Sequence, residues 1–342
     1  MALLEVKDLS TSFRTEDGVV RAVDGVNFTV EKGQTLGIVG ESGCGKSVTC
    51  LTIMGLNSKR NTVTGGEALW KGNDLLSMKP SALRAVRGDE ISMIFQDPMT
   101  SLNPVHTIGR QLIEAVLLHR DVTKRVARSR ALELLKAVGI PRAETRIDDY
   151  PHQFSGGMRQ RVMIAMALIN DPDLLIADEP TTALDVTTQA QILDLMNRLQ
   201  SEFGSAIIMI THDLGVVAEV ADDVVVMYAA RVQEEGEVRD LFHRPQHPYT
   251  WGLMGSLPRL DTDLERLYQI PGQPPSLLNP PSGCRFHPRC AFAMPICRQQ
   301  DPRLMAVGSD TLHEQACHLD EATKAREAAK LVAMFTAGAS SS

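Results

Sequence analysis

A glycine-rich stretch of eight residues carries the clearest chemistry in the sequence, and it reads Gly40-Glu41-Ser42-Gly43-Cys44-Gly45-Lys46-Ser47. It fits the pattern G-x-x-x-x-G-K-[ST] and lies between an expected strand over residues 35–39 and an expected helix over residues 46–56. Glycines let the main chain approach a ligand closely, so backbone N–H groups of such a loop can surround phosphates. Lys46 would then neutralise the β and γ phosphates, and Ser47 would ligate Mg²⁺. The stretch predicts a nucleotide-binding loop.

Polar side chains also follow three further apolar runs. Asp178 and Glu179 come directly after residues 174–177, and we expect Asp178 to anchor Mg²⁺ and Glu179 to act as the general base. His212 comes shortly after residues 206–210 and can reach the γ phosphate, whereas Gln96 follows residues 91–95 and can bind Mg²⁺ or the attacking water. Each residue alone has an ordinary structural explanation. Open α/β sheets, however, bind ligands beyond the carboxyl ends of their strands, which favours one shared site.

The elements that must position these side chains alternate between apolar runs and helical patterns. Residues 174–177 and 206–210 flank a helical stretch over residues 187–202, an order that predicts a parallel sheet with crossover helices. Apolar spacing typical of helices also extends over residues 107–168. We therefore expect an α/β domain over residues 1–244 that contains a helical part at about residues 100–168.

The composition changes near residue 244. Residues 245–302 hold most of the prolines and predict a loop-built appendage, not a second sheet. We expect an extension over residues 245–320 and a tail over residues 321–342, with a short helix at 321–335 and disorder over 337–342. 

Charge and hydropathy exclude some classes of function. The formal net charge of -7 argues against nucleic acid as the main partner, because such proteins usually carry a basic surface. No run reaches the ~18 apolar residues that span a bilayer, and the start of the chain lacks the pattern of a signal peptide. We expect a chain that stays in the cytoplasm and reaches a membrane only through another protein.

Residues Phe154-Ser155-Gly156-Gly157-Met158-Arg159-Gln160-Arg161 settle the class, because they resemble the signature sequence of ABC ATPases. Ser155, Gly156 and Gly157 would offer a second helix N-terminus to a phosphate. The resemblance implies that this helix reaches the ATP held by a partner subunit.

The order of the motifs also resembles this family: phosphate loop, Gln96, signature, Asp178-Glu179, Ala183-Leu184-Asp185 and His212. The implied fold is an ABC-type phosphate-loop ATPase, in which a RecA-like core joins a β-rich subdomain and an α-helical subdomain. In this family an aromatic residue stacks on adenine, and Phe13 matches it. The implied cofactors are ATP and Mg²⁺.

A narrower resemblance rests on Ile94 to Pro104, Tyr150-Pro151-His152-Gln153, Ala177 to Asp185 and His247-Pro248-Tyr249-Thr250. These stretches are similar to the ATPases of dipeptide and oligopeptide permeases, and the extension with Gly283-Cys284 and Pro288-Arg289-Cys290 resembles theirs. The resemblance implies a peripheral subunit at the cytoplasmic face of the bacterial inner membrane. Its implied partners are a different ATPase subunit, two transmembrane permease subunits and an extracytoplasmic peptide-binding protein.

Four of the six cysteines lie close together in the sequence: Cys284, Cys290, Cys297 and Cys317. Their spacing fits neither the ligand pairs of structural zinc sites nor the tighter runs of ferredoxins. Metal ligation would still crosslink and stabilise a segment that is rich in loops. Resemblance to the permease extension implies a [4Fe–4S] cluster on these four residues, while zinc and free thiols stay open as alternatives.

The sequence as a whole predicts an ATPase that energises the import of di- or oligopeptides. Related importers of nickel, glutathione or haem precursors are alternatives. A soluble ABC ATPase acting on nucleic acid is disfavoured, because the chain has no coiled-coil insertion and no second cassette, and because its net charge is negative. A purely regulatory subunit is disfavoured because every catalytic position is intact.

Overall fold

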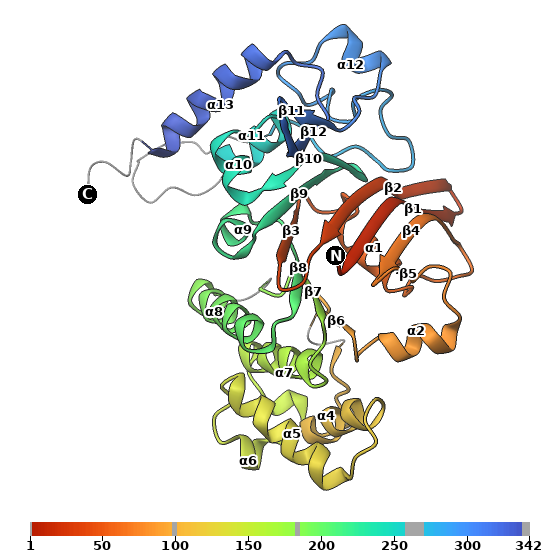
Figure 1. Ribbon diagram of the computed structural model, residues 1–342, viewed down its shortest axis with the longest axis vertical. Coiled ribbons are helices and arrows are strands. Elements are labelled where there is room, and N and C mark those ends of the chain that lie inside the picture. The colour runs from red at the N-terminus through yellow and green to blue at the C-terminus, as the bar shows by residue number, and fades with distance from the viewer. Residues whose placement is uncertain (1, 98–100, 182–184, 257–269, 337–342) are drawn as a thin grey trace. The chain divides into compact units, whose positions relative to one another are not determined.

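The computed structural model describes residues 2–97, 101–181, 185–256 and 270–336 (Figure 1). The chain divides into two compact units. Unit 1 contains Val30–Thr35 and Ser77–Ile210, and unit 2 contains Leu3–Thr29, Leu36–Leu76 and Thr211–Ser342. Among the described residues, no helix combines the length and the apolar character needed to cross a membrane.

Unit 1 is built on parallel strands whose side chains are nearly all buried. They are β6 (Ile91–Ile94), β7 (Leu174–Asp178) and β8 (Ala206–Thr211). Ile94 pairs with Ala177, and Asp178 pairs with Ile210, so the strands end at nearly the same level. Strands of a parallel sheet covered on both faces are expected to be continuously apolar, and β7 and β8 are buried along their whole length. The strands predicted at these positions are confirmed.

The helical pattern predicted over residues 107–168 is also confirmed. Its elements are α4 (Ile108–Leu117), α5 (Lys124–Ala137), α6 (Ala143–Arg146), the 3₁₀ turn η1 (Pro151–Gln153) and α7 (Gly156–Leu168). Thr107, Thr123 and Ser155 cap three of these helices by accepting a hydrogen bond from a backbone N–H of the first turn. The helices pack on one another within unit 1 (Figure 1), which also contains α2 (Pro80–Val86) and α8 (Val186–Phe203).

Unit 2 begins with an antiparallel sheet in the order β2-β1-β4-β5. Its strands are β1 (Leu4–Thr15), β2 (Gly18–Val30), β4 (Thr62–Trp70) and β5 (Asn73–Asp74). The register of β1 against β4 shifts between Lys7 and Ser10, where Asp8 has a left-handed φ of 46°. This bulge moves the alternation by one residue, so Leu9 rather than Asp8 continues the buried face begun by Leu4.

The second part of unit 2 places β3 (Thr35–Val39) parallel to β9 (Asp223–Tyr228), and β9 antiparallel to β10 (Arg231–Glu237). Three helices belong to this part: α1 (Lys46–Ile53), α9 (Leu214–Val220) and α10 (Val238–His243). Gly37 of β3 lets α9 come close, since a Cβ there would lie 2.7 Å from Val217 Cγ1.

The C-terminal extension differs from the expected loop-built appendage, because it adds two strands to β10. They are β12 (Asp310–Gln315), antiparallel to β10, and β11 (Met305–Val307), antiparallel to β12. The physical reason is the outer edge of β10, whose backbone groups need partners. The extension also forms α11 (Pro248–Gly255), α12 (Pro295–Gln299) and α13 (Glu321–Thr336), which confirms the predicted C-terminal helix. The disorder predicted over residues 337–342 falls outside the described residues.

Aromatic side chains attach the extension to β9. Tyr228 of β9 packs against Tyr249 of α11 with ring centroids 4.7 Å apart, and against Phe286 with centroids 5.2 Å apart. Tyr249 and Phe286 also touch, at 5.3 Å. All three side chains are almost fully buried. Such a core makes the extension part of unit 2 rather than a separate lobe.

Candidate functional site

The glycine-rich loop lies between β3 and α1, as its sequence predicts. Two of its glycines are required by close approach of other backbone segments. A Cβ on Gly40 would lie 2.1 Å from the carbonyl oxygen of Met227, and one on Gly45 would lie 2.2 Å from that of Ala22. Both residues have positive φ, 151° and 108° respectively, which L side chains rarely adopt. The loop shape therefore depends on glycine at these two positions.

Lys46 begins α1 and turns its side chain back along the loop. Its ammonium donates hydrogen bonds to the carbonyl oxygens of Gly40, at 2.7 Å, and Glu41, at 3.1 Å. The side chain is buried, while Ser42 and Gly43 at the tip of the loop are exposed and Ser47 is half-buried. The arrangement suits an anion-binding loop, because a buried cation lies beside a glycine-rich turn whose tip residues, Ser42 and Gly43, are exposed.

Cys44 is a packing residue in the loop. Its thiol is buried, and burial raises its pKa, although nearby Lys46 acts in the opposite direction. The carbonyl oxygen of Cys44 accepts a hydrogen bond from the N–H of Ala230 at 2.8 Å. The loop is thus attached to the segment that joins β9 to β10.

In unit 1, the two predicted carboxylates end β7. Asp178 is the last residue of the strand and is buried, and Glu179 follows it with a left-handed φ of 47°. The N–H of Glu179 donates to the carbonyl oxygen of Ile210 at 2.9 Å. Gln96, after β6, donates from Nε2 to Oε2 of Glu179, also at 2.9 Å. Unit 1 therefore brings Gln96 and Glu179 into direct contact, beside the strand end that carries Asp178.

The predicted signature also lies in unit 1, at the start of α7. Ser155 is the N-cap, and its hydroxyl accepts a hydrogen bond from the N–H of Met158 at 3.3 Å. Ser155 and Gly156 are exposed, and a Cβ on Gly156 would meet nothing within 4 Å among the described atoms. A Cβ on Gly157 would lie 3.0 Å from Thr188 Cγ2. The N-terminus of a helix of 13 residues is thus open to a ligand.

Two further predicted residues belong to unit 2, like the glycine-rich loop. Phe13 lies half-buried in β1, opposite Thr62 of β4. His212 is exposed directly after β8 and before α9, whose N-terminus is capped by the carboxylate of Asp213. Of the predicted loop at residues 183–185, only Asp185 is described, as the N-cap of α8; residues 98–100 of the stretch after Gln96 also lie outside the description.

The four clustered cysteines lie in the extension and form no disulfide bond. The N–H of Cys284 donates to the carbonyl oxygen of Cys297 at 2.9 Å. Burial raises the pKa of Cys284 to about 11 and that of Cys290 to about 12, and the neighbouring thiols add to both shifts. Burial likewise raises the pKa of Cys317. Across the part of the chain that the structure describes, no group of three or more His, Cys, Asp or Glu side chains is placed to hold a metal ion, so the predicted [4Fe–4S] site gains no support.

Sequence reasoning gave no role to two residues that touch the glycine-rich loop. The hydroxyl of Tyr249 accepts a hydrogen bond from the N–H of Glu41 at 2.8 Å, and Arg289 forms an ion pair with the Glu41 carboxylate. Both lie inside stretches that resemble permease ATPases, His247 to Thr250 and Pro288 to Cys290. The sequence signal was present, but no spacing rule connects it to a loop more than 200 residues earlier.

Two protein families match the chain. The family described as "ABC transporter" matches residues 23–182, and "Oligopeptide/dipeptide transporter, C-terminal region" matches residues 233–297. The dipeptide transport ATP-binding protein DppD of Lactococcus lactis is 56% identical over 89% of this chain and 88% of its own length. The oligopeptide transport ATP-binding protein OppD of Salmonella typhimurium is 55% identical over 88% of this chain and 89% of its own length.

Solved structures show the same fold. The ATP-binding cassette MJ0796, in a dimeric post-hydrolysis state bound to ADP and Pi, aligns with a TM-score of 0.62 at 28% identity, over 69% of this chain and 99% of its own. The CbiO1 protein of Clostridium perfringens, part of the transporter complex CbiONQ, aligns with a TM-score of 0.59 at 30% identity, over 70% of this chain and 90% of its own. The chain therefore belongs to the ABC transporter family, as an ABC-type ATPase that carries the oligopeptide/dipeptide transporter C-terminal region.

Proposed function

We propose that this ABC-type ATPase energises the import of di- and oligopeptides across the cytoplasmic membrane. One observation carries the proposal: residues 233–297 match the C-terminal region described for oligopeptide and dipeptide transporters, in a chain that also holds an intact glycine-rich loop. Relatives named as dipeptide and oligopeptide transport ATP-binding proteins are 55–56% identical over nearly the whole chain, which supports a shared substrate class.

The glycine-rich loop is proposed to hold the phosphates of ATP. Backbone N–H groups of the loop surround the phosphates, apart from that of Glu41, which donates to Tyr249. Lys46 exchanges its carbonyl partners for phosphate oxygens. Ser47, Gln96 and Asp178 supply the oxygen ligands that Mg²⁺ prefers, and the ion would neutralise charge on the β and γ phosphates. Phe13 stacks on the adenine.

Glu179 is proposed to take the proton of the attacking water, with His212 and Gln96 holding the geometry. The hydrogen bond from Gln96 orients the Glu179 carboxylate, and the left-handed backbone of Glu179 is the kind of strain that persists at functional positions. Proton transfer by a positioned side chain contributes roughly 10²- to 10⁴-fold to a rate.

The signature is proposed to serve the ATP bound by a partner ATPase. Ser155, Gly156 and Gly157 form an exposed helix N-terminus, which attracts negative charge through its free N–H groups and its dipole. The partners are a second, different ATPase subunit, two transmembrane permease subunits and an extracytoplasmic peptide-binding protein, without nucleic acid. The chain itself would lie peripherally at the cytoplasmic face of the inner membrane.

A [4Fe–4S] cluster on Cys284, Cys290, Cys297 and Cys317 is proposed on the sequence resemblance alone, since the side chains as placed do not form a ligand set. Protein purified without oxygen would be brown and contain about four irons per chain, with loss of both properties in a Cys290→Ser variant. Colourless protein without iron, or iron unaffected by the substitution, would exclude the cluster and leave zinc or free thiols at these positions.

Transport assays test the function. The chain is purified from membranes with the subunits that accompany it, placed in vesicles and supplied with its binding protein. Dipeptides and tripeptides should stimulate ATP hydrolysis and enter the vesicles, and Lys46→Ala should abolish both, whereas exposed Lys59→Ala should not. If nickel, glutathione or a haem precursor stimulates ATP hydrolysis and peptides do not, that compound rather than a peptide is the substrate. If the chain is purified without any membrane subunit, a role in transport is contradicted.

A further inference from the structure

The C-terminal extension reaches the glycine-rich loop through one arginine. Arg289 forms a two-point ion pair with the carboxylate of Glu41, with Nη1–Oε2 at 2.5 Å and Nη2–Oε1 at 2.9 Å. The Arg289 side chain is 5% exposed and that of Glu41 is 26% exposed, so solvent screens the pair only in part. Two-point pairing of this kind fixes orientation as well as charge.

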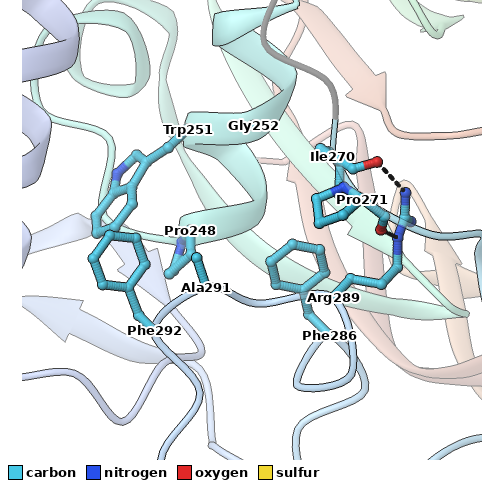
Figure 2. Close-up of a pocket in the computed structure, with 9 residues that line it drawn as sticks. All are labelled: Pro248, Trp251, Gly252, Ile270, Pro271, Phe286, Arg289, Ala291 and Phe292. Atoms are coloured by element: carbon cyan, nitrogen blue, oxygen red, sulfur yellow. Dashed lines mark hydrogen bonds between the residues drawn. The ribbon is translucent and has the colours of Figure 1, made fainter.

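The other donors of Arg289 hold it in place. Nε donates to the carbonyl oxygen of Pro271 at 2.8 Å, and Nη2 lies 3.4 Å from that of Ile270 and 3.3 Å from that of Gly272. Nη1 also donates to the hydroxyl of Tyr228 at 3.3 Å. Figure 2 shows the guanidinium turned towards Ile270 and Pro271, at the edge of a cavity of about 30 Å³ beside α11. Hydrogen bonds within the extension therefore hold the Arg289 guanidinium in the position from which it contacts the loop.

A second contact from the extension acts on the same loop residue. The buried hydroxyl of Tyr249 accepts the hydrogen bond of the Glu41 N–H at 2.8 Å. Backbone and side chain of Glu41 are therefore both held by residues of the extension, while the Glu41 carbonyl oxygen accepts from Lys46 at 3.1 Å. The position of the loop carbonyl groups that face Lys46 depends on contacts made more than 200 residues later in the chain.

Charge explains why the pairing matters for nucleotide. Glu41 stands inside a loop that must accept several negative charges, and an unpaired carboxylate there would repel them. An arginine that pairs with both oxygens cancels this charge and keeps the carboxylate turned towards the extension. Because Arg289 contacts the loop through hydrogen bonds to the Glu41 carboxylate, its effect on the loop passes through Glu41.

We propose that Arg289 is a positioning residue for nucleotide binding, which neutralises Glu41 and fixes the phosphate loop from the C-terminal extension. The proposal rests on the proposed role of this loop in binding ATP. It gives the extension a direct part in the nucleotide site of its own chain. Arg289 lies next to Cys290, so the segment that carries the clustered thiols is also the one that sets the loop.

Nucleotide titration of the full-length chain tests the proposal. The fluorescence of trinitrophenyl-ATP with Mg²⁺ gives the Kd for wild type, Arg289→Gln, Glu41→Gln and the double variant. We expect Arg289→Gln to raise the Kd about tenfold or more, since it leaves a carboxylate unpaired beside the phosphates. Glu41→Gln removes that carboxylate, so the double variant should return to within about threefold of wild type.

A matched control separates positioning from general stability. His313 is a fully buried residue of the extension whose hydrogen bond, 2.9 Å long, goes to Glu234 of β10 and not to the loop. His313→Gln should lower Tm yet leave the Kd within about twofold of wild type. If Arg289→Gln does not fold, Arg289→Lys replaces it and should give an intermediate Kd, because lysine keeps the charge without the two-point geometry.

The outcomes distinguish this inference from the proposed function. Wild type that fails to bind the nucleotide would overturn the role of the loop itself. Wild type that binds, with an Arg289 variant that binds equally well, would overturn only the inference. A double variant no tighter than Arg289→Gln would also overturn it, because a merely structural arginine is not rescued by removing Glu41.

Discussion

The side-chain amide of Gln96 donates to the carboxylate of Glu179 across 2.9 Å. Gln96 follows β6 and Glu179 follows β7, and the parallel register pairs Ile94 with Ala177, so the two side chains leave neighbouring strand ends. The N–H of Glu179 is held by Ile210 of β8. Segments from three strands thus hold Glu179, with Gln96 contacting its carboxylate and Ile210 its backbone N–H, which suits the role of general base proposed for it.

Replacing Glu179 by glutamine should separate binding from hydrolysis. Glu179→Gln keeps the shape of the side chain but cannot accept a proton, so ATP hydrolysis should fall by ~10²-fold or more while nucleotide binding persists. Phosphate release by the assembled transporter measures hydrolysis. Titration with trinitrophenyl-ATP measures nucleotide binding. Exposed Glu202 at the end of α8 is the matched control, and Glu202→Gln should change neither. Unchanged hydrolysis would exclude Glu179 as the base.

Removing the partner of Glu179 should have a smaller effect. Gln96→Ala leaves the carboxylate in place but deletes the hydrogen bond that orients it, and we expect kcat to fall roughly tenfold. Gln96→Glu should lower kcat further than Gln96→Ala does, since a second carboxylate would face Glu179. Steady-state kinetics of both variants provide the test. If glutamate supports faster turnover than alanine, the orienting role is wrong.

A buried carboxylate should dominate the stability of the extension. Glu234 is fully buried and accepts from the N–H groups of Gln246 and His247, at 2.6 and 2.9 Å, and from Nε2 of His313 at 2.9 Å. Glu234→Ala leaves these donors without their acceptor and should destabilise unit 2 by about 3–5 kcal/mol. Thermal unfolding measures the loss. Exposed Glu237→Ala should change Tm little, and equal losses in the two variants would contradict this account.

The carboxyl group of Glu235 should make stability depend on pH. It lies directly opposite Glu314 in the β10–β12 pair, and its Oε2 is buried with no hydrogen-bond partner among the described atoms. Burial, with Glu314 and Asp223 adding to it, raises the pKa of Glu235 to about 8. The folded state therefore holds a proton that the unfolded state releases from its ordinary pKa upwards. This contribution is complete at acidic pH and is lost as the pH rises through about 8.

Glu235→Gln removes the titration while keeping a neutral side chain of the same size. We expect its Tm to match wild type near pH 5 and to exceed it at pH 8.5, with a difference of roughly 1–3 kcal/mol in unfolding free energy. Thermal scans across this range measure both proteins. Parallel pH profiles would mean that Glu235 ionises normally in the fold.

Much of the fold and of the nucleotide site could be predicted because its signals are local. Apolar runs marked β6, β7 and β8, and helical spacing marked α4, α5 and α7. Strands β11 and β12 were missed, since Met305–Val307 has only three residues and Asp310–Gln315 is mainly polar. They form because the edge of β10 offers backbone partners, and that edge exists only in the folded sheet.

By itself, the sequence determined the glycine-rich loop and the strand-end carboxylates, because a loop between strand and helix is specified by contiguous residues. Only the tertiary structure decided that Arg289 pairs with Glu41, 248 residues earlier, and that Gln96 touches Glu179, 83 residues later. Ion pairs and side-chain hydrogen bonds need particular atoms within about 3 Å. No periodicity or motif spacing encodes such a distance between remote segments, so it is set by how the sheet and the buried aromatic core bring those segments together.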